Sequence, residues 1–153
     1  MAVVMLAGCG TTCRCCRPAT AGPASAPESV EVDGRQYTLT ASLWRDFQPV
    51  APPNGQPLAA VLKVLASDMM PLPADLAIDH VWVLNGEKQW SATADQPQGG
   101  REQSAATYLE EAVHGGPKWG PGIKVDVVVR LKRGKQKQTW LVRQAGVTIK
   151  RTD

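Results

Sequence analysis

Cysteine has the most reactive side chain in this sequence, and its distribution is uneven. All of the cysteines lie within the first sixteen residues: Cys9, Cys13, Cys15 and Cys16. A cluster of thiols is able to hold a metal ion or to act as a redox sensor, but a structural zinc site needs four nitrogen or sulfur ligands. The C-x-C-C spacing after Cys9 supplies three sulfurs, with no second CxxC pair and no histidine nearby. A metal-handling role therefore stays an alternative, and no metal or cofactor is predicted.

Side chains that could serve acid–base or nucleophilic catalysis are few and scattered. The chain has two histidines, His80 and His114, and neither lies at the spacing of a metal-binding or catalytic-triad motif. Glu110 and Glu111 are neighbours whose side chains point in different directions, so they do not form an acid–base pair. No cysteine follows residue 16, which excludes a cysteine nucleophile from the rest of the chain. We therefore predict that the protein is not an enzyme.

A segment rich in glycine and proline, residues 115–122, contains Lys118 and Trp119. A tryptophan displayed on a loop of constrained shape is a frequent binding contact, so this loop is a candidate binding surface. The alternative is that Trp119 closes one open end of the fold and the glycines only permit the turn. Trp44 and Phe47, which precede a proline-rich connection, form a similar but weaker candidate.

Positive charge is concentrated near the C-terminus. Residues 1–117 carry seven Lys/Arg and twelve Asp/Glu, whereas residues 118–153 carry ten and two. Five of these cations surround one predicted hairpin tip: Arg130, Lys132, Arg133, Lys135 and Lys137. Such a hairpin suits an anionic surface or an envelope protein as partner, or it is a solvated edge that resists aggregation. Nucleic acid is not predicted as a partner, because no aromatic side chain for base stacking lies amid the charge.

A four-residue motif ends at the first cysteine. Leu6-Ala7-Gly8-Cys9 resembles the lipobox of bacterial lipoproteins, in which an apolar residue and two small residues precede an obligatory cysteine. The resemblance implies cleavage before Cys9, attachment of lipid to Cys9, and a mature protein held on a membrane of the cell envelope. Three consecutive segments follow from it: a short signal peptide (1–8), a lipid-anchored flexible linker rich in Ala, Pro and Ser (9–29), and one folded domain (30–153).

The folded segment must position any binding surface, and its composition favours β-structure. The chain has 153 residues, enough for one domain, with twelve prolines and fourteen glycines. No apolar run approaches the ~20 residues of a membrane-spanning helix. Hydrophobic residues alternate with a period of two, which predicts strands at residues 37–44, 58–66, 78–84, 87–93, 123–131, 138–143 and 147–150.

Two local features refine this pattern. Asn85-Gly86 predicts a type I′ hairpin that places Trp90 opposite Val81. Residues 104–113 have helical spacing and are followed by a glycine pair, Gly115-Gly116, which predicts one short helix with a C-cap.

These patterns predict an all-β protein: a single antiparallel β-sandwich, Ig-like, with about seven strands and one short helix, preceded by a disordered N-terminal tether. A small barrel is the second choice. The predicted function is that of a non-catalytic cell-envelope lipoprotein, anchored to a membrane through its lipid, that presents the sandwich for binding or protein interaction. A cytosolic interaction module without lipidation and a metal-handling lipoprotein are the alternatives.

Overall fold

The computed structural model describes residues 22–94 and 106–153, and all its regular elements except one short 3-10 turn are β-strands. The elements in chain order are η1 (Pro23–Ser25), β1 (Ser29–Val32), β2 (Arg35–Asp46), β3 (Leu58–Ala66), β4 (Leu76–Asn85), β5 (Lys88–Thr93), β6 (Tyr108–Gly116), β7 (Lys124–Arg133) and β8 (Thr139–Thr152). The predicted all-β class is therefore confirmed for the described part of the chain.

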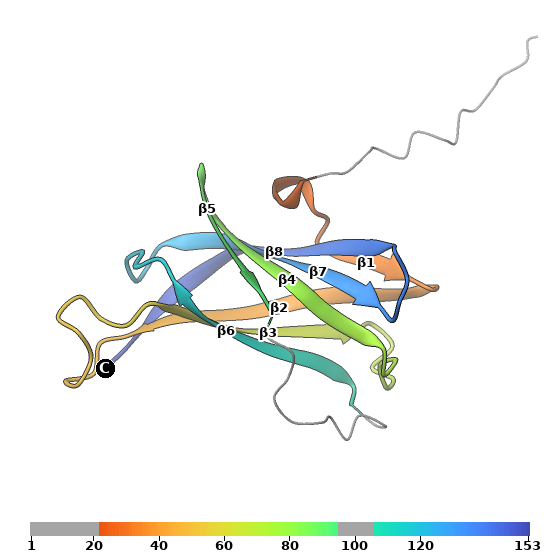
Figure 1. Ribbon diagram of the computed structural model, residues 1–153, viewed down its shortest axis with the longest axis horizontal. Helices are drawn as coiled ribbons and strands as arrows, with labels where there is room; N and C mark the ends of the chain where they lie inside the picture. Colours follow the sequence, from red (N-terminus) through yellow and green to blue (C-terminus); the bar gives the residue numbers. More distant parts are fainter. Residues whose placement is uncertain (1–21, 95–105) are drawn as a thin grey trace, which may run out of the picture.

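The strands form one sheet, which curls into a half-barrel (Figure 1). Its order is β5-β4-β7-β8-β2-β3-β6, and β1 pairs with β2 outside this path. Strand β8 joins the two halves, because it pairs antiparallel with β7 and then parallel with β2. Where β2 is not paired with β8, the side-chain carbonyl of Gln144 accepts a hydrogen bond from the Ala41 backbone N–H. A single Ig-like sandwich is not confirmed, since the strands make one continuous sheet.

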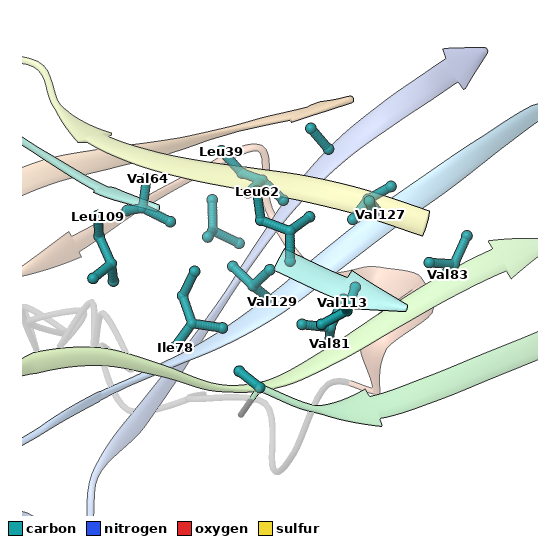
Figure 2. Close-up of a cluster of buried hydrophobic side chains, with 14 of the residues drawn as sticks. Leu39, Leu62, Val64, Ile78, Val81, Val83, Leu109, Val113, Val127 and Val129 are labelled. Carbon is teal, nitrogen blue, oxygen red and sulfur yellow. The ribbon is translucent and has the colours of Figure 1, made fainter. Parts of the chain in front are cut away.

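The hydrophobic core fills the concave side of this sheet. Alternate residues of two predicted strands are buried there as expected: Tyr37, Leu39, Ala41 and Leu43 of β2, and Val125, Val127, Val129 and Leu131 of β7. Figure 2 shows part of the cluster, to which β2, β3, β4, β6 and β7 all contribute side chains. Burial of this apolar surface is the main force that holds the two halves of the curled sheet together.

The predicted helix over residues 104–113 is wrong where the structure describes it. Strand β6 takes its place, antiparallel to β3, while residues 104–105 lie outside the described residues. Leu109, Glu111 and Val113 are buried and the residues between them are exposed, which is the period of a strand. The local helical spacing is outweighed by the ladder that β3 offers, because a strand's stability depends on its neighbours more than on its own preference.

The glycine pair predicted as a helix C-cap instead ends strand β6. Gly116 pairs with Leu58 of β3, and Gly115 has a φ of +83°. A Cβ atom on Gly116 would lie 2.9 Å from the Leu58 Cβ and 3.1 Å from the Trp90 ring of β5. The missing side chain therefore allows the two outermost strands of the path, β5 and β6, to approach each other.

The β4–β5 hairpin forms where it was predicted, but in a different register. The two-residue loop starts one residue later, at Gly86, so that Trp90 lies opposite Val83 instead of Val81. Gly86 has a φ of +58° and Glu87 has no positive φ, which is a Gly-X turn rather than the predicted type I′. A shift by two partners keeps every side chain on its face, so Trp90 still packs against the core.

The chain also contacts the sheet before the first strand. Ala26 is 3% exposed, and the Pro27 carbonyl accepts a 2.8 Å hydrogen bond from the Arg143 backbone N–H of β8. The Ala24 carbonyl accepts a second one, 3.3 Å long, from the Arg143 guanidinium. These residues belong to the predicted linker, whereas the predicted signal peptide and the linker up to residue 21 lie outside the described residues.

Candidate functional site

The predicted lipidation site, Cys9, lies outside the described residues, together with the other three cysteines. Within residues 22–94 and 106–153, no group of three or more histidine, cysteine or acidic side chains is arranged to hold a metal ion. In the same ranges, no helix is long and apolar enough to cross a membrane.

The predicted binding loop around Trp119 closes one end of the half-barrel. Trp119 is partly buried and packs against the core, while Lys118 is exposed. Both residues also turn their carbonyl groups inward, where each accepts a 3.2 Å hydrogen bond from the Arg45 guanidinium. The structure thus places Trp119 in the packed end of the fold rather than on display.

The predicted basic hairpin forms between β7 and β8, but its two arginines are paired with acidic side chains. Arg130 forms a bidentate ion pair with Asp79, with hydrogen bonds of 2.7 and 3.0 Å. Hydrogen bonding to Asp79 raises the pKa of Arg130. Arg133 pairs with Asp33 and, at 3.2 Å, with Asp75. The three lysines of the set make no hydrogen bond or ion pair with any described residue: Lys132, Lys135 and Lys137. Much of the predicted positive surface is therefore neutralised within the molecule.

A pocket that the sequence did not reveal lies on the outer face of β2, β3 and β6. Its volume is about 360 Å³, and its lining residues are Trp44, Asp46, Gln56, Pro57, Ala59, His114 and Gly115. Trp44 and Asp46 point outward because successive residues of a strand alternate, and Leu43 and Arg45 point inward. Ala59 is the cross-strand partner of Trp44, and its small side chain leaves the indole uncovered on that side. We call this site the Trp44 pocket.

A buried cation behind the sheet holds one wall of the Trp44 pocket in place. Arg45 is 4% exposed and donates hydrogen bonds to the carbonyls of Gln56, at 2.9 Å, and of Asn54. Its guanidinium also lies 4.9 Å from the centre of the Phe47 ring. The Gln56 backbone N–H donates in turn to the Asp46 carbonyl, at 2.7 Å. The loop that carries Gln56 and Pro57 is therefore fixed from two sides without a ligand.

Some polar groups of the Trp44 pocket are hydrogen-bonded within the protein, and others are available to a ligand. One oxygen of Asp46, Oδ1, accepts a 2.9 Å hydrogen bond from the Gln48 backbone N–H. The other oxygen, the Gln56 amide and the His114 imidazole make no hydrogen bond with any described residue. Lys150 of β8 is exposed and pairs with Trp44 from the side opposite Ala59. The pocket therefore offers one flat aromatic surface with hydrogen-bonding groups around it.

Part of this site was visible in the sequence. In the sequence, Trp44 and Phe47 are the weaker of two aromatic candidates, and His114 has no partner at the spacing of a metal-binding or catalytic motif. What sequence patterns do not show is that β6 is a strand paired with β3, which brings His114 within reach of a residue seventy positions earlier. The other histidine, His80, lies beside Trp82 on the outer face of β4, with the two ring centres 4.4 Å apart and the ring planes tilted by 51°.

Comparison with protein-family models, curated proteins and solved structures finds no match for this chain.

Proposed function

We propose that this protein is a non-catalytic cell-envelope lipoprotein whose β-domain binds a ligand in the Trp44 pocket. The observation that carries the binding role is the pocket itself, which has a volume of about 360 Å³ and the partly buried indole of Trp44 on one wall. Ligand sites are typically concave, largely apolar and pre-formed, with a few polar groups that fix orientation. The buried Arg45 and its carbonyl partners supply the pre-formed wall.

The strand order supports an Ig-like reading of the fold. If β2 is taken as strand A, β2-β3-β6 follows the A-B-E order of one Ig sheet, and β5-β4-β7-β8 follows the C′-C-F-G order of the other. The parallel contact of β2 with β8 then joins the two sheets along one side. Ig-like domains of this kind serve many unrelated functions, so the binding role is argued from the pocket and not from the topology.

The lipid anchor is proposed from the resemblance of residues 6–9 to a lipobox. Twelve residues lie between Cys9 and Gly22, where the described part of the chain begins, and the thirteen Cα–Cα steps from Cys9 to Gly22 span at most roughly 45 Å when extended. A lipid on Cys9 would therefore keep the domain close to the membrane surface. A single acyl chain holds a protein only weakly, so stable retention requires the several chains of a mature lipoprotein.

The anchor is tested by expressing the full chain in a bacterium and partitioning the cell extract in Triton X-114. We expect the wild-type protein in the detergent phase and the Cys9→Ala variant in the aqueous phase. A wild-type protein in the aqueous phase would contradict the anchor and favour the cytosolic alternative. Stoichiometric zinc or copper after anaerobic purification, lost in a variant with Ser at positions 13, 15 and 16, would instead favour the metal-handling alternative.

The binding role is tested separately, on the folded protein in solution. Five tryptophans give five indole N–H signals in an NMR spectrum, and the Trp44→Phe variant identifies the signal of Trp44. We expect at least one class of small probe, among neutral sugars, tetramethylammonium and phosphate, to shift the Trp44 signal in a saturable way. Trp82 lies half-buried on the outer face of the other half of the sheet, so its signal should stay in place. No shift with any probe would contradict the binding role.

A further inference from the structure

We infer that the Trp44 pocket takes an uncharged sugar ring. This inference rests on the proposed binding function and adds the class of ligand. It follows from three properties of the lining: a flat apolar surface, hydrogen-bonding groups of both kinds, and balanced charge.

The flat surface is the Trp44 indole, which is partly buried and flanked by the small side chain of Ala59 and by Pro57. The face of an aromatic ring carries partial negative charge, and its edge carries partial positive charge. The C–H groups on one face of a pyranose ring are weakly positive and lie nearly in a plane, so they complement an indole face. A branched aliphatic ligand would leave much of this flat surface uncovered.

The hydrogen-bonding groups stand around the indole rather than beneath it. Asp46 Oδ2 accepts, the His114 imidazole and the Gln56 amide both donate and accept, and none of the three is bonded to another described residue. A sugar presents hydroxyl groups at the edge of its ring, and each hydroxyl also donates and accepts. A ligand without such groups would displace water from these three side chains and would not replace the hydrogen bonds that the water makes.

The charges beside the pocket nearly cancel. Asp46 contributes one negative charge to the lining, and Lys150 contributes one positive charge next to Trp44. Arg45 lies on the other side of the sheet, where backbone carbonyls surround it, and Arg151 is paired with Asp153. An organic cation is therefore attracted by Asp46 and repelled by Lys150, whereas an anion is repelled by Asp46 and attracted by Lys150. A neutral ligand is repelled by neither charge.

Size and rigidity set the expected affinity. A pocket of about 360 Å³ is near the small end of the range for ligand sites, roughly 300–1,000 Å³, which suits one or two sugar rings. The fixed Gln56 wall lowers the ordering cost of binding. With a single aromatic platform and about three polar contacts, we expect a dissociation constant on the order of 1 mM for a monosaccharide.

The experiment titrates the folded protein with glucose, galactose, mannose and N-acetylglucosamine, and follows the indole and backbone N–H signals by NMR. We expect at least one of these sugars to shift the signals of Trp44 and of the backbone at His114 and Gln56 in a saturable way. Trp44→Ala should abolish the effect, and Asp46→Asn should weaken it several-fold. Trp82→Ala is the matched control, because it removes a half-exposed tryptophan from the other outer face, and it should bind as the wild type does.

The outcomes separate the ligand class from the binding function. If no sugar shifts Trp44 but tetramethylammonium or phosphate does, the sugar inference is wrong and the pocket remains a binding site. If neither the sugars nor the ions shift Trp44, the proposed binding function fails as well. If a sugar shifts Trp44 and Trp82 equally, binding is not at the Trp44 pocket and the inference is overturned.

Discussion

The two ends of the half-barrel are both organised by arginines, but in opposite ways. At the end that carries the C-terminus (Figure 1), the buried Arg45 donates to four backbone carbonyls of two loops and meets no carboxylate among the described residues. At the other end, the turns are joined by exposed ion pairs: Arg35 with Asp68, and Arg133 with Asp33 and Asp75. We call these the carbonyl end and the ion-pair end.

The difference has an energetic meaning. A buried carbonyl without a donor costs about 1–3 kcal/mol, so a cation that serves four of them is difficult to replace. Exposed ion pairs contribute little, since water and salt screen them and the long side chains lose freedom when they pair. The carbonyl end, which holds the Trp44 pocket, should therefore be the rigid end of the molecule.

The largest effect is expected when the central cation of the carbonyl end is removed. Arg45→Met should lower the free energy of unfolding by about 3 kcal/mol or more, because the carbonyls of residues 54, 56, 118 and 119 lose their donor inside the protein. Arg45→Lys should recover only part of the loss, since an ammonium group is a point donor that does not span four acceptors. Urea denaturation followed by tryptophan fluorescence measures both.

The matched control for this change is Arg35→Met at the ion-pair end. Arg35 also donates to carbonyls, those of Met70 and Pro71, but its side chain is 24% exposed whereas Arg45 is 4% exposed, so water is able to take its place. We expect a loss that is much smaller than that of Arg45→Met. Equal losses in the two variants would show that burial does not distinguish the two ends.

A second effect of intermediate size tests the packing of the carbonyl end. Gly116→Ala should cost about 1–3 kcal/mol, because its new Cβ would lie 2.9 Å from Leu58 and 3.1 Å from Trp90, in a region without free space. Gly34→Ala in the β1–β2 turn is the control at the ion-pair end. It has a φ of +79° and no neighbour within 4 Å, so it should cost about 1 kcal/mol through backbone strain alone. A smaller loss for Gly116→Ala than for Gly34→Ala would contradict the close packing.

The sequence was sufficient for features that depend on period-two alternation. The buried faces of β2 and β7 followed from it, because a half-buried strand must place every second side chain in the core. The alternation also predicted the face of the sheet on which Trp90 lies. It did not predict the register of the hairpin, because Gly86 is able to occupy either the first or the second position of a two-residue turn.

The features that the sequence did not reveal depend on contacts between distant residues. Residues 108–113 have the spacing of a helix, and only the pairing with the neighbouring β3 makes them a strand, with Glu111 buried between Leu109 and Val113. The Trp44 pocket depends on this same pairing, because it places His114 beside β2 and β3. The pairing of Arg130 with Asp79, fifty-one residues earlier in the chain, was equally hidden, and it is the reason why the hairpin is less basic than its composition suggests.

A smaller effect separates the two ends by their response to salt. Arg133→Gln should lower the free energy of unfolding by about 0.5 kcal/mol at low ionic strength, as the partners Asp33 and Asp75 are half exposed. At ~1 M NaCl the screening length is about 3 Å, so this difference should nearly vanish. The loss in Arg45→Met should remain at both salt concentrations. Urea titrations at the two salt concentrations measure the four values, and a salt-independent loss for Arg133→Gln would contradict the assignment.

The smallest effect is a dependence on pH that is confined to the ion-pair end. Hydrogen bonds from Arg35, at 2.7 and 2.8 Å, and from the Met70 backbone N–H, at 3.0 Å, hold the pKa of Asp68 below its ordinary value of 3.8. A carboxyl group with a lowered pKa stabilises the folded state above its unfolded pKa, and this stabilisation is lost as the pH falls through the folded pKa. Asp68→Asn should therefore be slightly less stable than the wild type at pH ~7, and the two should converge near pH ~2. Thermal unfolding across this range measures the difference, and a gap that stays constant with pH would mean that the charge of Asp68 does not stabilise the turn.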